Sequence, residues 1–346
     1  MVYAMEVFVE YMQFVFPTWF LRLAVRLFMR LEGLRTRCGD VVVRQIAVDQ
    51  ARKSLPVTTD VDVVNEELYG NDPAFFVAHL GPRLKYSACE FPTPQSSLAE
   101  AETFTLRKYQ ELAGLSELPA GSRVLELGCG WGSLSLANAE RFPQLAFTCF
   151  SNSPQQIEYI TQQAAERKLE NLTLHVEDYA DFVGGSSKVS EAGRACFDAA
   201  MAIETVEHAK NISALLEAVA GRLKPGAKLF VQSLLHQSTS YLLDESTWMG
   251  RNFFTGGSIL SLNSYFHLCP DSMRLVDLQP VSGDGYSLTL LAWLYQLEPQ
   301  RSVMVRRYGT AFYEGFRMFY ISCAESFAAN KGYEFMIGYY TFEKRS

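Results

Sequence analysis

The sequence predicts an α/β fold built on a doubly wound, mostly parallel sheet. Short apolar runs alternate with helical patterns over roughly 115 residues after Arg123, which is typical of parallel strands joined by crossover helices. A glycine-rich turn at residues 128–132 follows the first of these runs and precedes a helical pattern, a place where parallel sheets bind ligands. We therefore expect a Rossmann-like sheet of seven strands, with an N-terminal helical segment and a lid insertion.

The N-terminal helical segment contains a cationic stripe. Residues 19–31 are apolar except for Arg22, Arg26 and Arg30, a spacing that places three guanidinium groups on one face of a helix. Because a charge at the centre of a membrane span costs roughly 2.5–3.5 kcal/mol, a transmembrane helix is disfavoured. Two alternatives stay open: a cap packed on the catalytic domain, or peripheral membrane contact through residues 1–32.

Two further helices are expected before the glycine-rich turn. Pro73 can open a short helical stretch that runs to Leu80, because proline fits the first turn of a helix. A longer helix is expected from Ser97 to Leu115, since Glu100 stands three residues after Ser97, the spacing of a capping box.

The alternating pattern then gives the elements of the sheet. Strands are predicted at Arg123–Leu127, Ala146–Phe150, Leu172–Val176, Phe197–Ile203 and Ala227–Leu235. Helices are predicted between them at residues 131–141, 154–168 and 212–223, and towards the C-terminus a helix at 313–329 and a strand at 335–342. We expect an N-terminal segment of residues 1–75 and a catalytic domain of residues 76–346, in which the less regular, aromatic-rich residues 236–300 form a substrate lid.

Charge and cysteine content exclude several classes of protein. The net charge of −7 argues against a general nucleic-acid-binding protein, which needs a concentrated basic surface. The seven cysteines are scattered without a CxxC pair, so no metal site is predicted, and a reducing, cytoplasmic setting is expected.

The glycine-rich turn belongs to the run Glu126-Leu127-Gly128-Cys129-Gly130-Trp131-Gly132, which departs from the glycine spacing of dinucleotide-binding turns. A carboxylate directly before the glycines would repel a pyrophosphate, whereas it would attract the amino group of S-adenosylmethionine. The run resembles motif I of the class I methyltransferases, which use this cofactor.

Other segments resemble one branch of these enzymes, the cyclopropane-fatty-acid synthase family and its plant relatives, the coclaurine-type alkaloid N-methyltransferases. The segments are Leu84–Cys89 (K-Y-S-C), Phe150–Gln156, Glu177–Tyr179, Ile203–His208 (x-E-M-F-E-H, from which Thr205 and Val206 depart), Phe253–Gly257 (F-F-T-G-G) and Tyr286–Trp293. The resemblance implies that S-adenosyl-L-methionine is bound by Tyr86, Ser87, Glu126, Gly128, Gly130, Gly132, Ser151, Gln156, Asp178, Tyr179 and Ile203. In it, Ser151 and Gln156 replace the usual ribose-binding carboxylate, and Asp178 accepts from the adenine amine.

Three titratable side chains, Glu204, Glu207 and His208, follow the strand predicted at residues 197–203, where open α/β sheets bind ligands. Methyl transfer to an amine needs a free lone pair, yet most aliphatic amines are protonated at neutral pH. A carboxylate and an imidazole could attract the ammonium form and take its proton. We therefore predict that these three residues are catalytic.

The resemblance leaves the acceptor open between an amine and a lipid. In the synthases a bicarbonate ion takes the proton lost during ring formation, and the resemblance places its binding residues at Cys89, Glu207, Gln232 and Phe319. The synthases have His and Tyr at the last two positions, and a phenylalanine cannot donate to an anion. This difference favours the N-methyltransferases, whereas the segment Tyr286–Trp293 is closer to the synthases.

Aromatic side chains are expected to wall the acceptor site, because rings stack on planar substrates and attract cations. The predicted substrate pocket consists of Cys89, Trp248, Phe253, Phe254, Tyr286, Phe316, Phe319 and Tyr320. The sequence thus predicts a monomeric or homodimeric enzyme that transfers a methyl group from S-adenosylmethionine to the nitrogen of a small or medium amine. The alternatives are cyclopropanation or C-methylation of unsaturated fatty acyl phospholipids, and a cofactor-binding membrane adaptor without activity.

Overall fold

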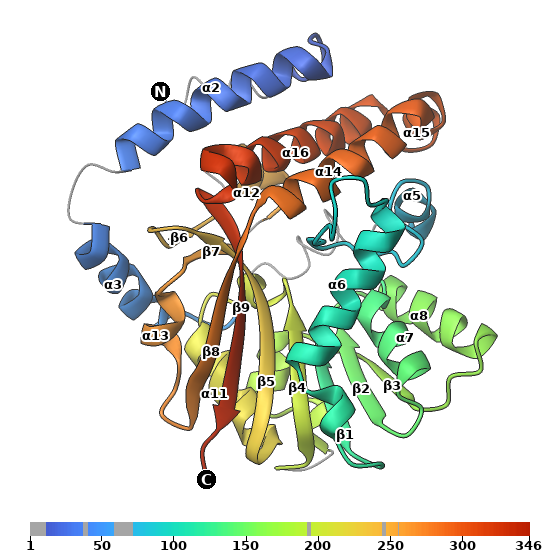
Figure 1. The fold of residues 1–346 in the computed structure, drawn as a ribbon, viewed down its shortest axis with the longest axis vertical. Helices are drawn as coiled ribbons and strands as arrows, with labels where there is room; N and C mark the ends of the chain where they lie inside the picture. Colours follow the sequence, from blue (N-terminus) through green and yellow to red (C-terminus); the bar gives the residue numbers. More distant parts are fainter. Residues whose placement is uncertain (1–11, 37–40, 59–71, 192–194, 244–246, 255) are drawn as a thin grey trace.

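A mostly parallel sheet forms the centre of the computed structural model, which describes residues 12–36, 41–58, 72–191, 195–243, 247–254 and 256–346 (Figure 1). Five parallel strands lie in the order β3-β2-β1-β4-β5, with bounds β1 Arg123–Leu127, β2 Ala146–Ser151, β3 Leu172–Val176, β4 Phe197–Ile203 and β5 Leu223–His236. Strand β9 (Phe335–Lys344) pairs antiparallel with β5, and β8 (Met273–Ser282) pairs antiparallel with β9. The predicted α/β fold with a mostly parallel sheet is confirmed.

Two short strands bring the described sheet to nine strands, so the prediction of seven was too low. Strand β7 (Ser258–Ser261) pairs in parallel with the last residues of β5, beyond those that contact β4, and β6 (Tyr241–Leu242) pairs with β7. The region predicted as an irregular lid is therefore largely regular, and β8 within it belongs to the main sheet. Strand β8 escaped prediction because it is a half-exposed strand whose apolar pattern is weak.

The sheet carries a separate apolar core on each face, because successive side chains point to opposite sides. Leu125 and Ala200 belong to the core under α9 (Tyr179–Gly184) and α11 (Ile212–Arg222). Val124 and Met201 belong to the core under three other helices: α6 (Leu98–Leu112), α7 (Ser133–Arg141) and α8 (Pro154–Glu166). Helices thus cover both faces, as a doubly wound sheet requires.

Local signals predicted the starts of two helices. Ser97 caps α6 by accepting from the Glu100 N–H (3.3 Å), while the Glu100 carboxylate accepts from the Ser97 N–H (2.8 Å), which is the expected capping box. Pro73 opens α5 (Pro73–Val77), which ends before the predicted Leu80.

A layer of C-terminal helices lies over the carboxyl end of β5 (Figure 1). It contains α14 (Asp284–Leu297), α15 (Arg301–Tyr308) and α16 (Thr310–Ala328), of which the sequence predicted only α16. The remaining short helices are α10 (Lys188–Glu191), α12 (Trp248–Asn252), α13 (Ser264–Leu268), η2 (Leu115–Glu117), η3 (Val206–His208), η4 (Glu298–Gln300) and η5 (Ala329–Gly332).

The N-terminal helix α2 (Thr18–Thr36) packs along α16, and α3 (Val41–Arg52) packs against α13. Arg22 and Arg26 of α2 both donate to the carboxylate of Glu325. Another face of α2 is apolar and exposed, with Trp19, Leu23 and Leu27 spaced four residues apart. Among the residues described, no helix combines the length and the apolar content that crossing a membrane requires.

Candidate active site

A cavity opens at the carboxyl ends of β1, β2 and β4, with about 1120 Å³ of free space that is partly open to solvent. Ten of the eleven residues predicted to bind the cofactor line it: Tyr86, Ser87, Glu126, Gly128, Gly130, Ser151, Gln156, Asp178, Tyr179 and Ile203. Glu204 and His208 line it as well. The cavity lies in the crevice where α/β sheets bind ligands.

The glycine-rich turn makes room for protein at two positions and for a ligand at a third. A β-carbon at Gly128 (φ 64°) would lie 2.0 Å from the Thr205 hydroxyl, so Gly128 allows Thr205 to pack. Gly132 does not line the cavity as predicted, because it packs against Ile160 of α8. At Gly130 (φ 52°) a β-carbon would meet no atom within 4 Å. Open space beside this backbone permits the close approach of a ligand.

Two side chains on the cavity suit parts of S-adenosylmethionine. The Ser151 hydroxyl donates to Gln156 Oε1 (2.6 Å), which leaves the buried Gln156 Nε2 without a hydrogen-bond partner in the described structure. The Glu126 carboxylate accepts from the Ser135 hydroxyl (2.8 Å), and burial raises its pKa to about 7. A buried amide donor fits a sugar hydroxyl and a buried carboxylate fits an ammonium group, so the residues present fit this cofactor.

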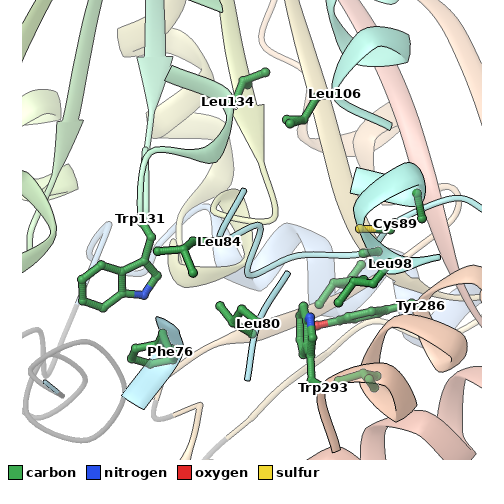
Figure 2. Packing of buried hydrophobic residues seen from close by; sticks show 14 of the residues in the cluster. Phe76, Leu80, Leu84, Cys89, Leu98, Leu106, Trp131, Leu134, Tyr286 and Trp293 are labelled. Atoms are coloured by element: carbon green, nitrogen blue, oxygen red, sulfur yellow. The ribbon is translucent and has the colours of Figure 1, made fainter. Parts of the chain in front are cut away.

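A segment that we call the roof, residues 84–89, runs from Leu84 beside Trp131 of the glycine-rich turn to Cys89 beside α14 (Figure 2). Its residues 84–87 line the cavity. Aromatic rings connect the two sides of the roof. Phe76 contacts Trp131 and Tyr86, with ring centroids 5.0 and 5.1 Å apart, and Tyr86 contacts Trp293 at 5.3 Å. The roof is therefore held by packing at both ends.

Sequence reasoning missed several residues that line the cavity: Thr58, Leu84, Lys85, Leu106, Tyr109, Cys129, Trp131, Ser133, Leu134, Phe150, Asn152, Glu177 and Thr205. Lys85 is the most consequential, because a buried ammonium group attracts carboxylates. It is 1% exposed and donates to the Ser87 hydroxyl (2.7 Å) and the Ala88 carbonyl (2.5 Å). The signal that could have found it is its place beside Tyr86 in the K-Y-S-C segment.

Glu204 stands directly after β4 with a left-handed backbone (φ 48°), which is strained for a residue with a β-carbon. One oxygen of its carboxylate accepts from the Ala88 N–H (2.9 Å) and from the Gln232 side-chain amide. Burial raises the pKa of Glu204 to about 7, although the Lys85 ammonium and these two hydrogen bonds oppose the rise. Glu204 therefore titrates close to neutral pH.

The His208 imidazole stacks on Phe254, with ring centroids 4.8 Å apart and planes at 26°. Gly257 leaves space for the Phe254 ring, because any larger residue there would place its β-carbon 1.8 Å from that ring. Burial lowers the pKa of His208 to about 4, so the imidazole is neutral at pH 7 and can accept a hydrogen bond at its unprotonated nitrogen.

Glu207 does not line the cavity, contrary to the prediction that groups it with Glu204 and His208. Its carboxylate accepts from the Ser233 hydroxyl (2.7 Å) and the Leu234 N–H, both on β5. Side chains in a 3₁₀ turn point about 120° apart, so neighbours in η3 face different directions. Glu207 anchors η3 to β5.

None of the eight residues predicted for the substrate pocket lines this cavity. All except Phe254 belong to an apolar core, where Phe253 stacks on Phe319 (4.6 Å between centroids) and contacts Phe316 (5.3 Å). Burial raises the pKa of the Cys89 thiol to about 12, so it stays protonated. The difference arises because rings at helical spacing serve packing as readily as binding.

Gly130→Val should abolish binding of S-adenosylmethionine, because the side chain would enter the open space beside the turn. Gly121→Val is the matched control: Gly121 has φ 83° and no atom within 4 Å of a β-carbon, but it does not line the cavity. Both variants carry comparable backbone strain, about 1–3 kcal/mol. Titration calorimetry should therefore show loss only in Gly130→Val, and retained affinity there would refute the assignment of the turn.

Comparison with known proteins identifies the family. The chain matches the family model described as mycolic acid cyclopropane synthetase over residues 58–335. It is 26% identical to (S)-coclaurine N-methyltransferase from Thalictrum flavum subsp. glaucum over 336 residues, 93% of this chain and 90% of that protein. It is 25% identical to cyclopropane-fatty-acyl-phospholipid synthase from Escherichia coli (strain K12), covering 77% of this chain and 65% of that protein.

Solved structures share the fold. The crystal structure of coclaurine N-methyltransferase bound to N-methylheliamine and SAH has a TM-score of 0.84 at 24% identity and covers 99% of both chains. A cyclopropane synthase from Mycobacterium tuberculosis has a TM-score of 0.68 at 17% identity, covering 83% of this chain and 99% of that one. The family model spans well over half of the sequence and includes the whole glycine-rich turn and the roof of the cavity. The chain therefore belongs to the mycolic acid cyclopropane synthetase family and is a class I methyltransferase that uses S-adenosylmethionine.

Proposed function

We propose that this enzyme transfers a methyl group from S-adenosylmethionine to the nitrogen of a small or medium amine. The observation that carries the proposal is that a base, the Glu204 carboxylate, and a hydrogen-bond acceptor, the neutral His208 imidazole, line the cofactor cavity together. The cofactor supplies an electrophilic methyl group. The protein's own task is then to hold the acceptor in line and to remove its proton.

Glu204 and His208 divide between them the tasks of holding the acceptor and removing its proton. Ionised Glu204 attracts the ammonium form of the acceptor, and its hydrogen bonds from Ala88 and Gln232 orient the carboxylate. The proton of the ammonium group then passes to Glu204, which is the stronger base because its pKa is about 7, and the amine is left with a free lone pair. The neutral His208 imidazole accepts a hydrogen bond that orients the amine. The ring of Phe254 stacks on His208 and so holds the plane of the imidazole.

The same geometry disfavours the cyclopropanation alternative. Two of the positions that the resemblance assigns to bicarbonate are Cys89 and Gln232. The N–H of Ala88, next to Cys89, and the side-chain amide of Gln232 both donate to Glu204. A bicarbonate ion there would meet the Glu204 carboxylate instead of free donors. Phe319 stacks on Phe253 and has no donor to offer. The coclaurine N-methyltransferase relative also matches more of this chain than the synthase does, 93% against 77%.

The pH dependence of kcat/KM should reveal the titration of Glu204. For an amine whose pKa lies well above the assay range, the ammonium form that binds stays at a constant concentration. Because the pKa of Glu204 is raised to about 7, log(kcat/KM) should rise with a slope of one below about pH 7 and level off above it. His208, with a pKa of about 4, does not titrate in this range. Glu204→Gln should remove the break and lower kcat by about 10²–10⁴-fold.

His208→Ala should cause a loss of similar size in the same assay, partly rescued at high pH where solvent supplies the free amine. The control is His267→Ala on α13, away from the cavity, which should behave as wild type. A Glu204→Gln profile that keeps its break contradicts the proposed role. A parallel loss of cofactor affinity in His208→Ala would make that residue structural.

Removal of carbonate from the buffer should leave methyl transfer unchanged, because the position beside Cys89 already holds a carboxylate of the protein. A cyclopropane synthase assayed in parallel serves as the positive control. Activity that collapses in degassed buffer and returns with added bicarbonate would favour the lipid reaction, as would cyclopropane rings in the lipids of an expressing host.

We also infer that α2 caps the C-terminal helices. Leu21 and Val25 are buried, and Arg22 and Arg26 are turned towards Glu325, which is 1% exposed, instead of towards lipid headgroups. Peripheral membrane contact is the alternative, since an apolar face of α2 is exposed.

Glu325→Gln should lower the free energy of unfolding by about 1.5–3 kcal/mol, because it removes the charge that two guanidinium groups share. Glu343→Gln is the control: its partner Arg274 is 57% exposed, so the loss should stay below about 1 kcal/mol. Denaturant unfolding gives both values. Salt-sensitive co-sedimentation of the wild type with anionic vesicles would instead support membrane contact.

A further inference from the structure

The last residue of α3 is a buried arginine with little charge compensation. Arg52 is 1% exposed. Its Nη1 donates to the Ser258 hydroxyl (2.5 Å), and its Nη2 donates to the Tyr241 carbonyl (2.9 Å) and the Ser240 hydroxyl (3.2 Å). The Asp49 carboxylate lies 4.0 Å from Nε, and neither Nε nor Asp49 Oδ1 has a hydrogen-bond partner in the described structure.

This arrangement is a poor source of stability. Taking a guanidinium group out of water costs several kcal/mol, and an apolar side chain of similar volume often serves a core better. The contacts of Arg52 are directional, however, and a planar guanidinium group can hold several acceptors in one geometry. Its position therefore indicates a role in orienting what it contacts.

The acceptors of Arg52 all lie at the base of one hairpin. Ser240 directly precedes β6, and Tyr241 is the first residue of β6. Ser258 is the first residue of β7, which pairs with β6. The chain between these strands carries α12 and then Phe254, the ring that stacks on His208. One guanidinium group thus holds both strands at the point where the hairpin leaves the sheet.

Neighbouring contacts hold the other side of the ring stack. The Ser258 hydroxyl donates to the carbonyl of Ala209 (3.4 Å), directly after η3. The Asn211 side chain donates to two carbonyls in residues 53–55, which follow α3 (2.9 and 3.0 Å). Thr58, a few residues further, lines the cofactor cavity. The end of α3 therefore contacts both the hairpin that carries Phe254 and the segment that follows His208.

We propose that Arg52 is a positioning residue for methyl transfer, which clamps the base of the β6–β7 hairpin and thereby sets Phe254 against the His208 imidazole. The inference rests on the proposed amine methylation. Arg52 lies outside the family match, which begins at residue 58. The clamp is thus a contribution of the N-terminal segment to a site whose reacting groups come from the catalytic domain.

Arg52→Met tests the clamp, because it keeps the apolar stem and removes every donated hydrogen bond. We expect kcat/KM for the amine to fall about 10–100-fold, the size of effect that a misplaced site causes. The Kd and KM for S-adenosylmethionine should stay within about twofold, since Arg52 does not line the cofactor cavity. Arg52→Lys should recover part of the loss. A cofactor affinity that falls in parallel with turnover would overturn the proposal.

A double-mutant cycle with Phe254→Leu separates positioning from general destabilisation. If Arg52 acts through Phe254, Arg52→Met should cost less than about twofold in the Phe254→Leu background. Equal losses in both backgrounds would also overturn the proposal.

The matched control is Arg317→Met. The Arg317 guanidinium group on α16 is 11% exposed and donates to the carbonyls of Gln13 and Phe16 (3.3 and 3.1 Å). The variant should lower the melting temperature and spare kcat/KM.

If Arg52→Met does not fold, Ser258→Ala removes one acceptor and carries the same test. In either variant the backbone amides of residues 257–261 should exchange hydrogen faster than in the wild type. A wild-type enzyme that methylates no amine of a panel contradicts the proposed function, and hydrogen exchange then still decides whether the clamp exists. An active wild type whose variants match it in kcat/KM and exchange contradicts the clamp itself.

Discussion

The hydrogen bonds of the Glu204 carboxylate unite the site, because they join parts of the chain that lie far apart in the sequence. Ala88 belongs to the roof, Gln232 belongs to β5, and Glu204 itself directly follows β4. The arrangement has two costs: a left-handed backbone, about 1–3 kcal/mol, and a carboxylate taken out of water. In return, the cofactor cavity gains a carboxyl group, that of Glu204, whose pKa lies close to neutral pH. A fully solvated glutamate would be ionised there and would have little affinity for a proton.

Features that depend on neighbouring residues could be predicted from the sequence, whereas features that depend on residues far apart in the chain could not. The strands from β1 to β5 and the Ser97 cap depend on neighbouring residues, and their patterns identified them. Helix α14 was missed because it is apolar nearly all round, so its sequence shows no amphipathic period. The pairing of Arg22 with Glu325, 303 positions apart, has no local signal at either residue.

The same distinction applies within the site. Ten of the eleven residues predicted to bind the cofactor line one cavity, because strand ends and the turns after them place residues by chain direction alone. The predictions failed where the direction of a side chain decides the role. Glu207 and His208 are adjacent, yet one anchors η3 to β5 and the other faces the cavity. Phe253 and Phe254 diverge in the same way, towards α16 and towards His208. Lys85 was overlooked because a single lysine in an apolar run gives no sign of burial.

A carboxylate built into the site also bears on the choice of acceptor. A bound anion can be exchanged with solvent and leaves neutral donors behind, whereas Glu204 is permanent and occupies donors that an anion would need. Its negative charge favours cationic acceptors and repels anionic ones, and the cavity has a low dielectric in which such differences are large. The residues that face the cofactor need not change for this. The choice of acceptor then depends on the elements around Glu204 and His208, namely the β6–β7 hairpin, η3 and the end of α3. These elements are joined by directional contacts of buried polar groups, which orient segments more than they stabilise them.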